Sequence, residues 1–335
     1  MESSSIIAAK QNLKVQLYIT ALSIFLFIAK ITAFFFTNSL AILTDALESI
    51  VNVVAGFIGV YSLYVVTKPR DKEHPYGHGK AEFVSAAAEG TLIIAAGCLI
   101  IYQTIHNLLA KKAIESLDTG LILVGITGLI NFAAGYYCLV VGKKNKSMAL
   151  QASGKHLQID TYTTFAIIAA LVVILYTKWF WLDAVVAFAV SLLILYNGYT
   201  IIRTSLAGIM DEADIVLLEQ LVVVLNNNRK ENWIDLHNLR VIKYGSTLHV
   251  DCHLTVPWFL NVHEAHKEID SLAVLIKREF DNALELFVHT DGCLDFSCAI
   301  CTKKGCTVRV QPFKEKIVWS LDNIIRNQKH GADII

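Results

Sequence analysis

The sequence predicts a membrane protein that consists of an all-α bundle of six transmembrane helices followed by a small α+β domain. Three observations lead to this fold class. Apolar residues make up 55% of the 335 residues and charged residues only 17%, whereas soluble domains carry about 25% charged residues. Six stretches are long and apolar enough to cross a bilayer. After residue 209 the pattern changes to the alternation and helical spacing of a soluble domain. A disordered chain or a small disulfide scaffold is therefore excluded.

The six predicted spans cover roughly residues 15–37, 40–66, 83–109, 118–141, 148–176 and 182–202. An even number of spans puts both ends of the bundle on the same side of the membrane. That side carries most of the basic loop residues, namely Lys10, Lys14, Lys68, Arg70, Lys72, Lys80, Lys143, Lys144 and Lys146, against Lys111, Lys112 and Lys178 on the other side. By the positive-inside rule we expect both termini to be cytoplasmic. The excess of Lys and Arg over Asp and Glu lies in the half of the chain that holds the apolar spans. It therefore indicates membrane orientation and not nucleic-acid binding.

Beyond residue 209 the sequence predicts two further regions, residues 210–292 and residues 293–335. Residues 210–292 predict a helix at 215–225, strands at 236–243 and 247–256 around a turn at Gly245-Ser246, a helix at 262–280 and a strand at 284–289. This order is typical of an α+β domain with helices on one face of the sheet, and such a domain is a plausible dimerisation module. Residues 293–335 are expected to form a cysteine-rich segment that ends in an amphipathic helix at 312–328, packed on the tail domain. The transmembrane domain is then residues 1–209.

Polar residues within the spans are the first candidates for function, because an ionisable group there costs about 2.5–3.5 kcal/mol on insertion scales. Glu48 and Asn52 in the second span are four residues apart and share one helical face, with Asp45 one turn earlier. His156 and Asp160 in the fifth span repeat this spacing. Two facing helices would thus present four nitrogen and oxygen donors, a set that suits a divalent first-row cation. The alternative is hydrogen bonding between helices, which is less favoured for two such pairs than for one.

The loop after the second span adds a further group of candidate metal ligands. Asp71, His74 and His78 lie within eight residues, and Gly77 and Gly79 allow the backbone to turn tightly. A lone histidine beside a membrane carries little information, whereas here a carboxylate and two imidazoles lie close together in a loop that can turn tightly.

Four of the seven cysteines gather beyond the second region, as Cys293, Cys298, Cys301 and Cys306. Reducing conditions in the cytoplasm argue against disulfides. Thiolate binding of zinc, copper(I) or an iron–sulfur cluster is the favoured interpretation. A redox switch and inert thiols remain open.

These motifs together resemble the cation diffusion facilitator family over about residues 15–292. The resemblance rests on Asp45-Ala-Leu-Glu-Ser, on His-Pro-Tyr-Gly-His-Gly-Lys-Ala-Glu from His74 to Glu82, and on His156-x-x-x-Asp160. It implies a six-span secondary transporter with a cytoplasmic ferredoxin-like domain. It also implies a homodimer in the cell (inner) membrane that exports divalent metal ions in exchange for protons.

The resemblance further implies which residues bind metal. The intramembrane ligands would be Glu48, Asn52, His156 and Asp160; the loop ligands Asp71, His74 and His78; and the ligands of the tail His253, His266, His289 and Asp291. His263 lies one helical turn before His266, so either could be the ligand. Asp45 would be a partner of a ligand, a proton relay or a group at the aqueous entrance.

The chain departs from the zinc-transporting members of the family at two positions. Those members usually have His or Asp where this chain has Glu48, and Asp where it has Asn52. These departures admit iron(II), manganese, cobalt or nickel beside zinc, while His156 argues against the hardest ions. We expect zinc as the first candidate substrate and iron(II) as the second. A membrane metal sensor whose tail reports occupancy is the alternative. No nucleotide-binding loop, hydrolase triad or His-Glu-x-x-His helix indicates an enzyme, and we expect no catalytic cofactor.

Overall fold

The computed structural model describes residues 4–37, 40–110, 120–177, 179, 181–244, 247–280 and 284–331. The chain divides into two compact units, Met1–Met210 and Asp211–Ile335. Lys111, Lys112 and Lys178, which entered the orientation argument, lie outside the described residues.

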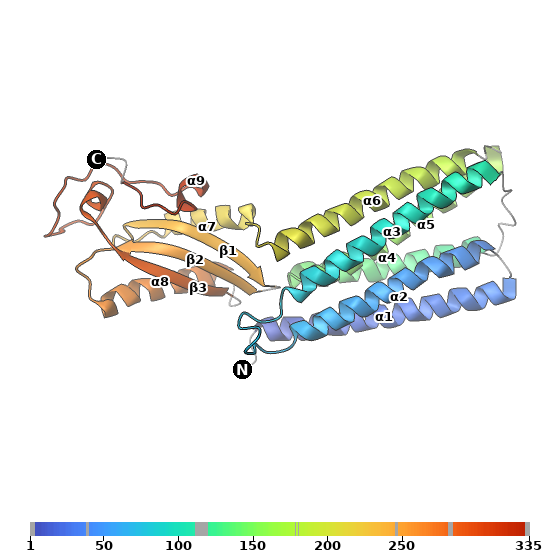
Figure 1. The fold of residues 1–335 in the computed structure, drawn as a ribbon, viewed down its shortest axis with the longest axis horizontal. Helices are drawn as coiled ribbons and strands as arrows, with labels where there is room; N and C mark the ends of the chain where they lie inside the picture. Colours follow the sequence, from blue (N-terminus) through green and yellow to red (C-terminus); the bar gives the residue numbers. More distant parts are fainter. Residues whose placement is uncertain are drawn as a thin grey trace. The chain divides into compact units, whose positions relative to one another are not determined.

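The first unit contains six long helices that run alongside one another (Figure 1). They are α1 (Ser4–Thr37), α2 (Leu40–Val66), α3 (Ala81–Ala110), α4 (Gly120–Lys144), α5 (Met148–Thr177) and α6 (Trp181–Ile209). Within the described residues, five stretches are long and apolar enough to cross a membrane: 7–32, 49–66, 81–106, 125–144 and 185–209. The fifth predicted span corresponds to α5, which opens with the polar segment that carries His156 and Asp160 and whose second half lies partly outside the described side chains. The predicted helical membrane domain is confirmed.

The surface of the bundle is apolar and its interior holds polar groups, as a lipid environment requires. Phe25, Phe57 and Leu193 are more than half exposed, whereas Gln16 and Ser191 are fully buried. In water this distribution would expose a large apolar patch. The bundle is therefore built to contact lipid outside and to bring polar side chains together inside.

Glycines let α4 and α5 approach closely. A Cβ atom on Gly154 would lie 2.9 Å from the carbonyl oxygen of Gly135, and one on Gly135 would lie 2.9 Å from that of Gly154. Small residues of this kind allow membrane helices to pack backbone against backbone. Gly154 lies two residues before His156, so this contact fixes the position of the first half of α5.

The second unit contains a three-stranded sheet and two main helices. The elements are α7 (Ile215–Asn227), β1 (Asp235–Tyr244), β2 (Thr247–Val256), α8 (Val262–Phe280) and β3 (Leu284–Gly292). The strand order is β1-β2-β3, with β1 antiparallel and β3 parallel to β2. The predicted α+β domain is confirmed, and β3 runs three residues beyond the predicted strand. The turn at Gly245-Ser246 lies outside the described residues.

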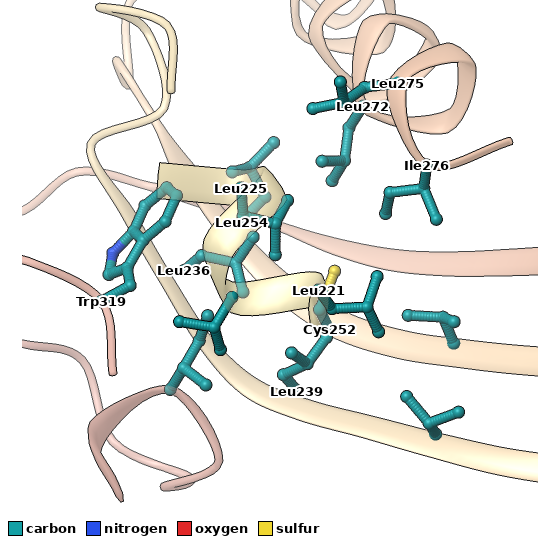
Figure 2. Packing of buried hydrophobic residues seen from close by; sticks show 14 of the residues in the cluster. Leu221, Leu225, Leu236, Leu239, Cys252, Leu254, Leu272, Leu275, Ile276 and Trp319 are labelled. Atoms are coloured by element: carbon teal, nitrogen blue, oxygen red, sulfur yellow. The ribbon is translucent and has the colours of Figure 1, made fainter. Parts of the chain in front are cut away.

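Alternation along the strands divides the sheet into an apolar and a polar face. Leu254 and Cys252 of β2 pack with Leu221 and Leu225 of α7 and with Leu272 of α8, as Figure 2 shows. These residues form the core of the second unit. Since side chains alternate, the histidines at odd-numbered positions of β2 lie on the opposite face. That face carries the candidate metal ligands of the tail.

The predicted helix at 312–328 is wrong except for one turn, α9 (Leu321–Ile324). Residues before it are extended because side chains of α7 and the following loop bind their backbone. Asn226 donates from Nδ2 to the Trp319 carbonyl (2.6 Å) and accepts from the Trp319 N–H (3.1 Å), and Arg229 donates to the Ile317 carbonyl (2.6 Å). The expected packing on the tail domain is confirmed, since Trp319 and Ile324 are buried in its core.

Candidate metal sites

The two ligand pairs predicted within the spans come from α2 and α5, and these helices meet inside the bundle. Asn52 donates from Nδ2 to Oδ2 of Asp160 at 2.6 Å. His156 Nε2 lies 3.7 Å from Oδ1 of Asp160, one helical turn away. His156 is buried, and only 17% of the Asp160 side chain is exposed. Three of the four predicted donors are thus gathered at one place in the bundle.

Glu48 is the fourth predicted donor. Its backbone belongs to α2, one turn before Asn52, but the side chains of Glu48 and Asp45 lie outside the described residues. Helical spacing puts Glu48 on the same face of α2 as Asn52.

The Oδ1 atom of Asn52 is buried and has no hydrogen-bond partner among the described residues. Asn52 lines a small cavity together with His156, Ser153 and Glu89. A buried carbonyl oxygen without a donor is costly, and a cation would satisfy it. The donor set of amide oxygen, carboxylate and imidazole therefore suits a divalent metal ion as cargo.

Glu89 of α3 was not predicted as part of this site. Its Oε1 lies 3.5 Å from Nδ1 of His156, and its Oε2 accepts a hydrogen bond from Ser153 (3.2 Å). Nδ1 is thus directed to a carboxylate while Nε2 is directed to Asp160, an arrangement that orients many metal-binding histidines. A second buried polar contact joins α1 and α2, since Lys30 Nζ donates to Ser49 Oγ (2.8 Å).

The loop between α2 and α3 brings its three predicted ligands together. His74 Nδ1 and His78 Nε2 lie 3.1 and 3.4 Å from the carboxylate of Asp71, and one ligand atom from each of the three residues lies within 4.8 Å of the others. The backbone N–H of His74 donates to Asp71 and holds the pKa of that carboxyl below its usual range. Gly77, at φ +92°, makes the turn that returns His78 to Asp71.

The tail cluster lies on the polar face of the sheet. His237 of β1, His253 of β2 and Asp291 of β3 have ligand atoms within 4.8 Å of one another. The strand register explains this, because His253 is opposite His237 on one side and His289 on the other. Burial, with the neighbouring His237, lowers the pKa of His253 and favours the neutral imidazole that binds metal.

The predicted tail ligands differ in where they lie. His289 Nε2 is 3.7 Å from Asp291 at the edge of the cluster. His266 does not join it: His266 is exposed on α8, 3.7 Å from Asp270. His237 takes part although the sequence left it unassigned. The signal that would have found it is its position opposite His253 once β1 and β2 are paired.

Residues near the C-terminus reach back to this cluster. His330 donates its backbone N–H to Asp235 (3.0 Å), and Asp235 Oδ2 lies 3.2 Å from Nδ1 of His237. Burial alone would raise the pKa of Asp235, but the contacts with His237 and His330 outweigh it and hold the pKa well below its usual range. Lys329 Nζ lies 3.2 Å from Asp291. The C-terminal segment therefore supplies positive charge beside the cluster.

The four tail cysteines are all free thiols and line one cavity. Burial raises the pKa of the Cys293 thiol, and the other three thiols raise it further. The remaining cysteines do not take part: Cys138 and Cys252 are buried in the two cores, and Cys98 is on α3.

Comparison with known proteins agrees with this architecture. The model of the cation efflux transmembrane domain matches residues 17–210, more than half of the chain, and the model of the cation efflux protein cytoplasmic domain matches residues 219–293. The chain belongs to the cation diffusion facilitator family. Members of this family are transporters, so the cation diffusion facilitator described here is a membrane cation transporter and not an enzyme.

Curated relatives of this cation diffusion facilitator align over most of both chains. The uncharacterized transporter sll1263 of Synechocystis sp. is 28% identical over 247 residues, which are 74% of this chain and 80% of the relative. The cation-efflux pump FieF of Shewanella oneidensis is 24% identical over 263 residues (78% and 88%), and that of Klebsiella pneumoniae is 26% identical over 276 residues (81% and 90%).

Proposed function

We propose that this transporter exports divalent transition-metal ions from the cytoplasm in exchange for protons, with zinc as first candidate and iron(II) as second. One observation carries the proposal: Asn52 of α2 meets Asp160 and His156 of α5 within the bundle. Relatives named cation-efflux pumps support the direction of transport.

The donor types support a transition metal over a harder ion. Magnesium and calcium favour all-oxygen sites, whereas His156 supplies a nitrogen donor. Zinc and iron(II) accept this mixture of imidazole and oxygen. Asn52 removes one negative charge from the set, which is why iron(II) stays the second candidate and manganese, cobalt and nickel follow.

Proton exchange follows from the chemistry of the ligands. Asp160 and Glu48 bind metal as carboxylates and His156 as a neutral imidazole, so metal entry releases protons and protonation expels metal. An acidic far side would thus unload the site, and the empty site would return protons.

The other metal sites have supporting roles in this proposal. The loop trio Asp71, His74 and His78 and the tail cluster would bind the same class of ion on the cytoplasmic side and report its concentration. We propose a homodimer in the cell (inner) membrane, which the match to the cytoplasmic domain supports.

Metal flux in proteoliposomes tests the proposal. With a pH gradient imposed, we expect saturable uptake of zinc and iron(II) and outward movement of protons, both lost when an ionophore collapses the gradient. Asp160→Ala should abolish uptake while the protein still inserts. Metal binding to the tail without any flux would contradict transport and favour the sensor, and normal flux by Asp160→Ala would contradict the site.

A further inference from the structure

The segment after β3 extends beyond the part of the chain that matches the cytoplasmic domain, which ends at residue 293. Its regular structure consists of the short 3₁₀ helix η1 (Asp295–Ala299) and the single turn α9. Its far end is held by Trp319 and Ile324, which are buried in the core of the tail domain. The part around the cysteines packs on a smaller apolar cluster of Ile234, Ile300 and Cys301, with Cys293 and Ile317 beside them.

Four cysteines surround one cavity in this segment. Cys293, Cys298, Cys301 and Cys306 all line a cavity of about 30 Å³, which is larger than the space that one water molecule needs. They reach it from three points of the chain: the end of β3, the Cys298–Cys301 turn, and the turn before Cys306. At that last turn Gly305 has φ +69°, a conformation that favours glycine.

Arg309 holds the central turn in place. Its guanidinium donates to the carbonyls of Cys298 (2.7 Å), Cys301 (3.0 Å) and Lys303 (3.0 Å). The Cys298 carbonyl also accepts from the Cys301 N–H at 3.4 Å. The two thiols of the Cys-x-x-Cys unit are therefore presented by a fixed backbone turn, the arrangement from which tetrahedral thiolate sites are built.

The charges around the cavity suit a thiolate complex. A divalent ion bound by four thiolates carries a net charge of about −2. Lys303 and Arg309 line the cavity, and Lys303 Nζ donates to Asn232 at 2.7 Å, which anchors the loop to the tail domain. Two cations at the wall offset that charge.

We propose that Cys293, Cys298, Cys301 and Cys306 bind one zinc ion in a tetrahedral site that holds the C-terminal segment folded on the tail domain. The four thiols release four protons to solvent as they bind, and no electron is transferred. The loop trio and the tail cluster are the described groups whose ligand atoms converge within 4.8 Å. The four cysteines are not such a group: they line one cavity without their sulfurs converging to that distance, so zinc would have to draw them together. This site is separate from transport and does not depend on the proposed function.

Thiol protection in the intact protein tests the proposal. The full chain, purified in detergent under reducing conditions and stripped with a chelator, is treated with a colorimetric thiol reagent before and after zinc is added. We expect zinc to protect four of the seven cysteines, and chelator to restore their reactivity. Loading with cobalt(II) should give a sulfur-to-cobalt charge-transfer band. Four thiols that stay reactive in zinc, with no such band in cobalt, would overturn the proposal.

Variants identify the thiols. Cys298→Ser and Cys306→Ser should each lower bound zinc by one ion per chain, whereas the matched control Cys98→Ser on α3 should not. The thiol assay on the unmodified chain decides the matter even if a variant fails to fold. Two alternatives would contradict the proposal: acid-labile sulfide with iron would indicate an iron–sulfur cluster, and a mass lower by two hydrogen atoms per cysteine pair would indicate disulfides.

Discussion

Asn52 is one of the two positions at which the intramembrane site departs from the zinc-transporting members of the family. Its amide donates to Asp160 at 2.6 Å, so an aspartate there would put two carboxylates in contact and strengthen the attraction for a cation. We expect Asn52→Asp to change the ratio of zinc to iron(II) transport by at least about tenfold, which corresponds to about 1.4 kcal/mol. Competition between the two ions in proteoliposomes measures this ratio.

The matched control for that experiment is Asn145→Asp. Asn145 lies in the turn between α4 and α5, where it donates to Asn12 at 2.6 Å. The control should leave the ratio unchanged. Unaltered selectivity in Asn52→Asp, at normal flux, would show that Asn52 is not a ligand.

Asp235 should make the stability of the tail depend on pH. Its folded pKa is lowered, so its contribution is fully present above its unfolded pKa of about 3.9 and is lost as the pH falls toward the folded value. Asp235→Asn should reduce the free energy of unfolding by about 1–3 kcal/mol at pH 7, and this difference should shrink below about pH 4. Urea unfolding of the metal-free chain, followed by the fluorescence of buried Trp233 and Trp319, measures it.

The exposed carboxylate Asp322 of α9 provides the comparison for Asp235. Asp322→Asn should leave both stability and its pH dependence nearly unchanged. An equal loss at pH 7 and pH 3 in Asp235→Asn would contradict the linkage and leave only a packing defect.

At the level of elements, the contact between α4 and α5 positions the first half of α5. A Cβ atom on Gly154 would lie 2.8 Å from Leu139 Cγ and 2.9 Å from the Gly135 carbonyl oxygen. Because that carbonyl oxygen belongs to the backbone, the helices must separate, at about 1–3 kcal/mol. We expect Gly154→Ala to displace His156 and to lower zinc flux by at least about tenfold.

Gly125 of α4 provides the control for this prediction. A Cβ atom there would meet Ile168 Cδ1 at 3.7 Å, an ordinary van der Waals contact. Gly125→Ala should therefore transport zinc nearly as well as the unmodified chain. Full flux in Gly154→Ala would show that the close approach does not position the site.

Periodicity predicted most elements because local sequence decides them. The apolar runs of the bundle and the alternation in β2 predicted most of the observed helices and strands within a few residues, but α1 begins eleven residues before the predicted span and α6 ends seven residues after it. The segment 312–328 failed for the opposite reason. Its backbone groups are bound by Asn226 and Arg229, which lie about 90 residues earlier, and no local pattern reveals such a contact.

The same distinction applies to the candidate sites of the whole molecule. His156 and Asp160 were predictable because they are polar residues at helical spacing in a membrane helix. His237 and Glu89 were missed because each meets its partner only through folding: His237 through strand pairing with His253, and Glu89 through the packing of α3 on α5. Sequence spacing reveals ligands that lie on the same helix or strand. Residues from other elements that complete a site are revealed only by the tertiary structure.

Membrane orientation is the prediction that applies to the whole molecule. Transport out of the cytoplasm requires the loop trio and the tail to face the metal supply, which the distribution of basic residues predicts. The loop between α2 and α3 and the far end of α5 then lie on opposite sides of the membrane, since successive helices alternate in direction.

In spheroplasts, a membrane-impermeant maleimide should label Tyr176→Cys, whose native side chain is 87% exposed at the end of α5. It should label Lys72→Cys only after permeabilisation. The reverse pattern would mean that the transporter moves metal into the cytoplasm or that the positive-inside rule fails for this chain.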